Sequence, residues 1–452
     1  MSSRFRVYRW RAALAVGAVG LSSAAYAGEP VVSGSGAWCA PRCDQLVIDW
    51  NQTAHQFFAA ENGHADPLGA SRTMAMMHLA MHDAVNAVKP RYASYALQER
   101  AAGADAAVAA VTAAHNVLLA IHPKQAGLLK AQLQGALQDA GQGAAVESGK
   151  ALGARAAKAI LDRCANDGST ARETYTPGTR AGEYRYTPGF DFIALPQWRR
   201  VQPFALRDPS QFRVVAPPAL DSAAYTRAYE EVKRLGAAEG ARRTADQMHY
   251  AAFWYEFSEI GWNRIARVVA RQKPMDLAER ARMFALVNVA LADSYIAGWD
   301  SKMHYDAWRP VTAIRLAAND GNPATQPDAK WSSMLPTPPI QDHPSTHSAL
   351  GAAAAEVLQQ VFGRDDVAFV FTSSSADVAN PARRFASFSD AARENADSRV
   401  MAGLHFRFAT DAGLQLGRQV GDTAATQILQ PLADSAANEQ AFGSTDRSSS
   451  AN

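Results

Sequence analysis

The chain has 452 residues, of which 48% are hydrophobic and 19% are charged, a composition typical of globular proteins. This length suits two or three domains or one large helical unit. The formal net charge is only +2, and the first 27 residues hold four arginines and no acids. The remaining chain is therefore close to neutral and lacks the basic field that nucleic-acid binding requires, so we expect no nucleic-acid partner.

The first 27 residues have the organisation of a signal peptide. Basic residues precede the apolar run "AALAVGAVGL", which is too short to span a bilayer, and Ala25-Tyr26-Ala27 forms a small-x-small cleavage pattern. We expect export across a bacterial inner membrane, to the periplasm or the medium, and a mature chain without a membrane span. The alternative is an N-terminal membrane anchor.

Three cysteines remain in the exported part. Cys39 and Cys43 lie in "CAPRC" and could pair locally in an oxidising compartment, which leaves Cys164 over. A zinc site at Cys39 and Cys43 is disfavoured because no second pair of ligands lies nearby in the sequence.

Apolar residues recur at helical spacing through the first half of the exported chain. They predict helices over residues 66–88, 104–121, 124–139 and 143–165, with Gly and Pro at the joins. Residues 175–218 are rich in Pro and aromatic residues and have no period. We interpret them as a long ordered connection across a surface, with a domain division nearby.

Helices resume after this connection and continue almost to the end of the chain. They are expected near 221–236, 243–271, 276–300, 345–362, 390–402 and 410–428. The predicted fold class is all-α, with two packed helical bundles. The predicted division is a signal peptide (1–27), an N-terminal helical region with the connection (28–218), a catalytic helical bundle (219–431) and a disordered tail (432–452).

The stretch "WDSKMHYDAWRP" is the first of three that suit an oxyanion. Lys302 and Arg309 are seven residues apart, so a continuous helix would place both on one face. Pro310 disfavours helical geometry at Arg309, so the helix is expected to end there. Two cations on one face could grip an oxyanion from one side. The alternative is a pair of solvated cations beside Asp300 and Asp306.

The second stretch, "DHPSTHS", opens a predicted helix. Ser345 is a suitable N-cap after Pro344. The N–H groups of Thr346 and His347 are then free to bind an anion, aided by the helix dipole. His347 can exchange a proton near neutral pH. The alternatives are a capped helix with surface histidines, or a divalent-metal pair with His343, which the intervening proline and the lack of an HExxH pattern disfavour.

The third stretch is "SRVMAGLHFRFATDAG". Arg399 offers a planar fork of donors that suits two oxygens of one anion. Gly403 is expected to end the helix that carries Arg399, and Thr410 or Asp411 can cap the next one. The turn between the helices can bring His405 to the same point as Arg399.

The three stretches together form one ordered pattern: Lys, six residues and Arg-Pro; then Pro-Ser-x-His; then Ser-Arg, three residues and Gly-x-His. This pattern resembles the superfamily that joins vanadium-dependent haloperoxidases with type 2 phosphatidic acid phosphatases and related acid phosphatases. The motifs span residues 302–405, and the helical pattern extends the resemblance over about 221–428. The N-terminal half is similar to the additional bundle of the bacterial haloperoxidase-like branch.

The resemblance implies a role for each motif residue. The groups that would hold the oxygens of vanadate or phosphate are Lys302, Arg309, Ser345, the N–H of Thr346, and Arg399. His405 would be the axial vanadium ligand of a peroxidase or the nucleophile of a phosphatase, and His347 the acid–base residue. The implied function is vanadate-dependent oxidation of a halide by hydrogen peroxide, with Lys302 polarising the bound peroxide and a small organic molecule as co-substrate. A phosphatase would need no cofactor and would take a phosphate ester.

Four positions bear on the choice of branch. Thr346 stands where the family usually has Gly, and its side chain is expected to narrow the pocket. Ala409 stands where the phosphatase branch commonly has an Asp that orients the nucleophile; the next acid is Asp411. Trp299 resembles an aromatic residue near the halide of a fungal chloroperoxidase, and Asp293 is expected to pair with an active-site arginine. Ala409, Trp299 and Asp293 favour the peroxidase branch, whereas Thr346 bears on halide selectivity and on the access of peroxide.

Other interpretations stay open. A periplasmic acid phosphatase would use the same residues, and an oxyanion-binding or structural protein with a decayed site would use them without catalysis. His78 and His82 are expected to be hydrogen-bonded between helices rather than to bind a metal. The aromatic residues from Trp254 to Trp262 are expected in the core on one helix. A homo-oligomer is compatible with the sequence.

Overall fold

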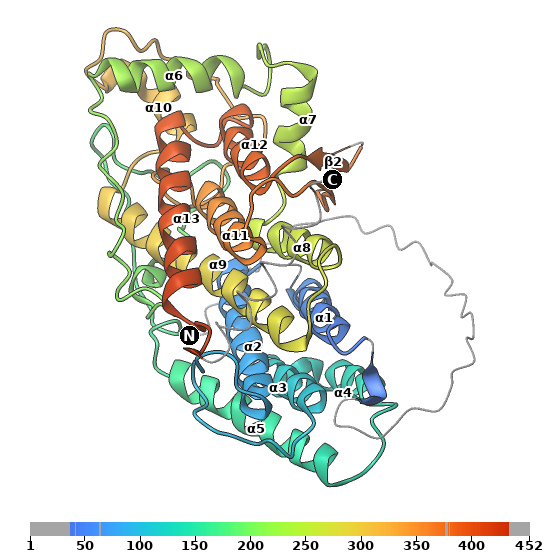
Figure 1. The fold of residues 1–452 in the computed structure, drawn as a ribbon. Helices are drawn as coiled ribbons and strands as arrows, with labels where there is room; N and C mark the ends of the chain where they lie inside the picture. Colours follow the sequence, from blue (N-terminus) through green and yellow to red (C-terminus); the bar gives the residue numbers. More distant parts are fainter. Residues whose placement is uncertain (1–36, 41, 63–64, 376–377, 379, 434–452) are drawn as a thin grey trace, which may run out of the picture.

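The structure is a computed structural model that describes residues 37–40, 42–62, 65–375, 378 and 380–433. The expected signal peptide and nearly all of the expected disordered tail lie outside the described residues. Within them the fold is all-α apart from one small hairpin, so the predicted fold class is confirmed (Figure 1).

Five helices form the N-terminal half: α1 (Gln45–Asn62), α2 (Pro67–Val88), α3 (Ala106–Ile121), α4 (Ala126–Ala136) and α5 (Ala144–Cys164). The C-terminal half contains α6 (Ala223–Leu235), α7 (Ala245–Phe253), α8 (Ser258–Ala270), α9 (Leu277–Tyr305), α10 (Pro310–Leu316), α11 (Thr346–Phe362), α12 (Phe388–Met401) and α13 (Arg407–Gln427). Short 3₁₀ turns occur at Ala37–Cys39, Pro123–Gln125, Pro196–Arg200 and Ala317–Asn319. Strands β1 (Phe369–Thr372) and β2 (Ala382–Phe385) pair antiparallel.

Two predicted helix bounds were wrong, and two helices, α1 and α10, were missed. The helix expected over 243–271 is broken at residues 254–257 into α7 and α8. Helix α9 continues to Tyr305 and ends at Asp306, which adopts a left-handed conformation with φ of 47°. Apolar periodicity continues through the break at 254–257, so it could not reveal the change of direction.

One hydrophobic core runs through both halves of the chain. It includes Trp50 from α1, Met77 from α2, Phe284 from α9 and Leu350 from α11. Figure 1 shows α1–α5 in the lower half, α6, α7, α10 and α12 in the upper half, and α9 between them. Every residue of α9 from Met283 to Trp299 is buried, so this helix supports both halves of the molecule. The domain boundary at residue 218 stays a prediction.

Helices α11 and α13 pack unusually closely because α13 presents glycines to α11. These glycines recur every four residues, at Gly413, Gly417 and Gly421. A Cβ on Gly417 would lie 2.1 Å from the carbonyl oxygen of Ala349, so a side chain there would push the helices apart. The close approach also places the Ser345 N–H 2.8 Å from the carbonyl oxygen of Ala409. The start of α11 is thereby held against the start of α13.

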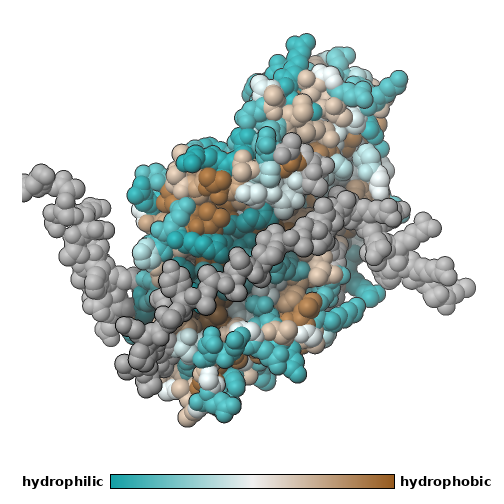
Figure 2. Space-filling model, turned by 90° about the vertical axis from the view of Figure 1, so that its right-hand side faces the viewer, coloured by the Kyte–Doolittle hydropathy of each residue, from teal (hydrophilic) through white to brown (hydrophobic). Residues whose placement is uncertain are grey.

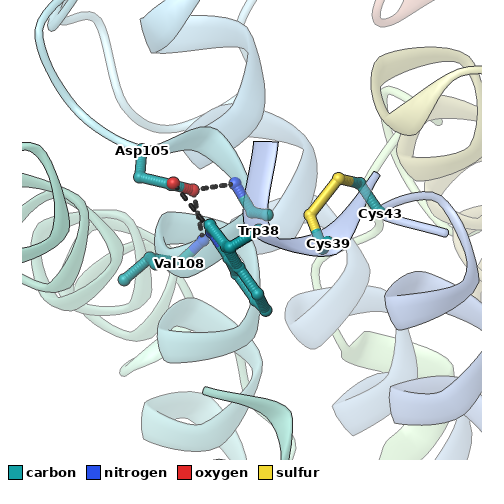
Figure 3. The surroundings of a disulfide bond; sticks show 6 residues. Trp38, Cys39, Cys43, Asp105 and Val108 are labelled. Carbon is teal, nitrogen blue, oxygen red and sulfur yellow. Dashed lines mark hydrogen bonds between the residues drawn. A yellow bond between two sulfur atoms is a disulfide. The ribbon is translucent and has the colours of Figure 1, made fainter. Parts of the chain in front are cut away.

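A disulfide joins Cys39 and Cys43, as the sequence allows, and staples the turn before α1 (Figure 3). The indole of Trp38 beside it donates a 2.8 Å hydrogen bond to Asp105. The other carboxylate oxygen of Asp105 caps α3 by accepting the N–H of Val108 at 3.0 Å. The N-terminal turn is thus fastened to the start of α3.

The long connection lies along the second half of α9 and the loop before α11. Asp293 accepts the N–H groups of three consecutive connection residues, Phe204, Ala205 and Leu206, at 2.7–3.1 Å. The expected pairing of Asp293 with an active-site arginine is therefore wrong. The segment is further joined to the loop by the Ala194 N–H, which donates to the carbonyl of Pro339.

Among the described residues, no single helix is long and apolar enough to cross a membrane. The pair formed by Ala106–Ile121 and Pro123–Ala136 meets the length and composition criteria together but is bent by 119°. Figure 2 shows one face of the molecule, on which hydrophilic residues surround small hydrophobic patches.

Candidate active site

Lys302 and Arg309 are completely buried, but they do not share a helix face as predicted. Lys302 lies in the last turn of α9, and Arg309 is the N-cap of α10, because the chain turns at Asp306. The alternative of solvated cations is also wrong. Asp300 pairs with Arg213 instead, and Asp306 accepts hydrogen bonds from Tyr175 and Gln341.

The two cations are held mainly by backbone carbonyls of the loop before α11. Lys302 Nζ donates to the carbonyls of Gln341 and Asp342 at 2.6 and 3.1 Å. Arg309 donates to the carbonyls of Ile340 and Leu404, both at 2.7 Å. Burial lowers the pKa of both side chains, most strongly that of Lys302, because desolvation disfavours their charged forms.

Helix α11 begins as the sequence predicts. Ser345 is its N-cap, and its hydroxyl accepts the N–H of Ser348 at 3.3 Å. The N–H groups of Thr346 and His347 have no acceptor within the helix, because the first turn of an α-helix never supplies one. The methyl of Thr346 is directed at α9, since a Cβ on Gly298 would lie 2.2 Å from it. The methyl therefore fills the space that Gly298 leaves in α9.

A backbone carbonyl in the segment between α7 and α8 contacts both His347 and Arg399. The carbonyl oxygen of Trp254 accepts hydrogen bonds from His347 Nε2 and from Arg399 NH1, with N···O distances of 2.8 and 3.2 Å. The guanidinium of Arg399 lies 5.7 Å from the ring centre of Tyr255. Burial and the neighbouring Arg399 lower the pKa of the partly exposed His347 well below its usual value. Its ring is therefore neutral at neutral pH, with the proton on Nε2 and a lone pair on Nδ1.

Gly403 ends α12 and turns the chain toward His405, as expected. Its φ is +78°, and its close packing against the backbone of Gly236 leaves no space for a side chain. The N–H groups of Leu404 and His405 both donate to the carbonyl of Arg399. Arg399 and His405 are thus locked into one turn. The expected cap at Thr410 or Asp411 is wrong, because α13 begins at Arg407 with Phe406 as its N-cap.

Asp342 is the site residue that the sequence did not reveal. Its carboxylate is completely buried, and its Oδ1 lies 2.9 Å from His405 Nδ1 and 4.0 Å from Arg309 NH1. The contact with His405 is close but not aligned as a linear hydrogen bond. Burial raises the pKa of Asp342 to about 7, although Arg309 and Lys302 oppose the shift. Asp411 is exposed, and its charged neighbours are Arg407, Glu231 and Asp397.

The assembled site holds an excess of buried positive charge. Lys302, Arg309 and Arg399 surround His405, and Asp342 is the acid that interacts with Lys302 and Arg309. The Nε of Arg399 is buried without a hydrogen-bond partner. Buried charge is stable only when it is paired. The donors, the free N–H groups of α11 and the unpaired charge therefore fit a small oxyanion such as vanadate or phosphate.

The remaining candidate residues lie outside this cradle. His78 contacts Asn51 at 2.9 Å and His82 contacts Asp83 at 3.2 Å, both buried between helices as expected. His343 faces the connection, with its Nε2 2.8 Å from the carbonyl of Val215. Across the described part of the chain, no group of three or more His, Cys, Asp or Glu residues is arranged to hold a metal cation.

The fold and the site define an all-α protein with a buried oxyanion cradle and a histidine aimed at it. Residues 282–434 match the family described as the VCPO second helical-bundle domain. The vanadium chloroperoxidase of Curvularia inaequalis is 28% identical over 267 residues, which are 44% of this chain and 43% of that protein. The chain thus matches less than half the length of this curated relative.

Solved structures extend the similarity to the N-terminal half. The first bacterial vanadium-dependent iodoperoxidase superposes with a TM-score of 0.71 at 26% identity, over 86% of this chain and 97% of that one. A holo-type bacterial vanadium-dependent chloroperoxidase shares the fold with a TM-score of 0.66 at 21% identity, over 80% and 91% of the two chains. These matches confirm the resemblance of the chain to the vanadium haloperoxidase family.

Proposed function

We propose that this protein is a vanadate-dependent haloperoxidase-like enzyme that oxidises a halide with hydrogen peroxide. The observation that carries the proposal is the buried cradle of Lys302, Arg309 and Arg399 around His405, at the free N–H groups of α11. Positive charge preorganised in an enclosed site stabilises a compact oxyanion far more strongly than water-exposed charge does.

The residues of the cradle divide the binding between them. The oxygens of vanadate would be held by Lys302, Arg309, Arg399, the Ser345 hydroxyl and the Thr346 N–H. His405 Nε2 would be the protein's ligand to vanadium. When bound, vanadate supplies a Lewis-acid centre that activates hydrogen peroxide toward attack by a halide ion. An activated halogen species would then react with a small organic molecule.

His347 would handle the proton of the incoming peroxide. Its Nε2–H is engaged by the carbonyl of Trp254, so Nδ1 is the nitrogen that can accept a proton. The neutral state of the ring suits it to this role at neutral pH. Lys302 and Arg399 are held by carbonyls rather than by acids, so their positive charge stays directed at the anion.

We also propose that the mature protein acts outside the cytoplasm. The basic and apolar start of the chain supports export, and the disulfide between Cys39 and Cys43 suits an oxidising compartment.

A phosphatase that uses the same residues is the second candidate. The observation that favours it is the carboxylate of Asp342 beside His405, an arrangement that also suits a histidine nucleophile. His405 would take the phosphoryl group, and His347 would protonate the leaving group after its Nδ1 has itself taken up a proton, which its lowered pKa restricts to acidic conditions.

Paired assays on the mature protein separate the two activities. One sample is loaded with orthovanadate and tested for peroxide-dependent oxidation of bromide and iodide. The other is vanadate-free and tested for hydrolysis of a chromogenic phosphate ester. Halide oxidation that requires vanadate and is lost in His405→Ala supports the peroxidase, whereas ester hydrolysis that vanadate inhibits supports the phosphatase. His304→Ala, an exposed histidine of α9, is the matched control. Activity that survives in His405→Ala would refute both proposals.

A further inference from the structure

His405 lies between a cation and a carboxylate, one at each ring nitrogen. Its Nε2 is 2.9 Å from Arg309 NH1, and its Nδ1 is 2.9 Å from Asp342 Oδ1. A guanidinium carries only donors, so Nε2 must be the acceptor in the first contact. An imidazole whose Nε2 accepts a hydrogen bond is neutral and carries one ring proton. The single ring proton must then lie on Nδ1, facing Asp342.

Backbone hydrogen bonds hold Asp342 in place, so its carboxylate keeps a fixed position beside this proton. Its N–H donates to the carbonyl of Ala307 at 3.0 Å, and its own carbonyl accepts Lys302 Nζ. The side chain is completely buried. Asp342, which belongs to the second stretch, therefore contacts Lys302 of the first stretch through its backbone and His405 of the third through its carboxylate, and so links all three stretches.

The position of Asp342 also explains how His405 is oriented without an acid on its own helix. The phosphatase branch of the superfamily commonly has an Asp four residues after the histidine, and this chain has the buried Ala409 there. The next acid, Asp411, has other charged partners. Asp342, in the loop before α11, therefore supplies the carboxylate beside His405 in place of an acid on α13.

We propose that Asp342 is the positioning residue of His405: it holds the proton on Nδ1 and so keeps Nε2 unprotonated, with a lone pair that Arg309 NH1 engages until an oxyanion binds. The proposal deepens the function proposed above and rests on it for the identity of the anion. A carboxylate that orients the second nitrogen of a ligating histidine typically contributes 10- to 100-fold to affinity. The Nδ1–H state itself is a property of the protein without any anion.

The test reads the tautomer directly. The full mature chain is labelled with ¹⁵N-histidine, and two-bond ¹⁵N–¹H correlations are recorded at neutral pH without oxyanion; His405→Gln identifies the His405 signals. We expect the wild-type ring to be protonated on Nδ1. A wild-type ring protonated on Nε2 would overturn the proposal, and this measurement needs no variant at Asp342.

Variants then connect the tautomer to binding. In Asp342→Leu, which is of similar size and accepts no hydrogen bond, we expect a mixture of tautomers and an orthovanadate affinity about 10- to 100-fold weaker by equilibrium dialysis. Asp342→Asn retains one acceptor oxygen, so its tautomer ratio and orthovanadate affinity are expected to lie between those of Asp342→Leu and the wild type. This variant replaces Asp342→Leu if the latter does not fold. Asp306→Asn, which alters a neighbouring carboxylate bonded to the same loop, is the control and is expected to change neither reading.

The outcomes distinguish the positioning role of Asp342 from the proposed function of the site. A folded Asp342→Leu with the wild-type tautomer and affinity would refute the positioning role. A wild-type protein that shows the Nδ1–H tautomer but binds neither orthovanadate nor phosphate would refute the proposed function and leave the tautomer assignment standing.

Discussion

Replacing Arg399 with methionine should stabilise the anion-free protein while removing its response to oxyanions. The Arg399 guanidinium is buried, and its Nε lacks a hydrogen-bond partner. Without an anion, this buried charge destabilises the folded state. Methionine has a flexible chain that can fill the same space without a charge.

The magnitude follows from the desolvation of Arg399. Burial lowers the pKa of Arg399 from its usual value to about 10, which corresponds to about 3 kcal/mol of unfavourable free energy for the charged form. Methionine would relieve this term. It would lose one hydrogen bond to Trp254, about 1 kcal/mol, and the contact with the Tyr255 ring, up to about 1 kcal/mol. The Trp254 carbonyl keeps its hydrogen bond from His347. The net expectation is a gain of about 1 kcal/mol.

The assay is urea unfolding in anion-free buffer and again with saturating orthovanadate. The wild type should gain about 2.7 kcal/mol at an orthovanadate concentration 100 times the Kd, and Arg399→Met should gain much less. Arg393→Met changes an exposed arginine of the same helix, which pairs with Asp390, and should keep the full orthovanadate response. A destabilisation of Arg399→Met by more than about 1 kcal/mol without anion, or an unchanged orthovanadate response, would contradict the argument that the site holds excess positive charge.

Three further perturbations test the support of the site. Gly403→Ala should lower the free energy of unfolding by more than about 1 kcal/mol, because its φ is +78° and backbone crowds it; unchanged urea unfolding would count against the strained turn. Asp293→Ala leaves three backbone N–H groups unpaired and should cost about 3 kcal/mol or more, with faster proteolysis within residues 190–215; wild-type proteolysis rates would contradict it. Burial raises the pKa of Glu259 to about 8, so the folded state retains a proton that the unfolded state releases above about 4.5. Its contribution to stability is therefore present below about pH 4.5 and is lost as the pH rises to about 8. Glu259→Gln should lose this dependence and gain stability over the wild type at pH 8 but not at pH 5, whereas parallel pH profiles of the two proteins would refute the assignment.

Local chemistry determined most of the helices, and the resemblance of the motifs to a known superfamily indicated the cradle residues. The Ser345 cap and the Gly403 stop could be recognised from sequence because capping and left-handed turns depend on residues within one helical turn. The order and spacing of Lys302, Arg309, Ser345, Arg399 and His405 along the chain indicated one anion site through their resemblance to a known superfamily.

Tertiary packing decided how these residues are held and which acid serves them. Asp342 is distant from His405 in the sequence, whereas the next acid after His405 along the chain, Asp411, is exposed and has other charged neighbours. Asp293 was assigned to an arginine, but it binds backbone N–H groups of the connection. The Trp254 carbonyl joins His347 to Arg399 only because the chain breaks between α7 and α8. Contacts of this kind depend on the approach of distant segments, such as the glycine-lined packing of α13 on α11, and no local propensity encodes that approach.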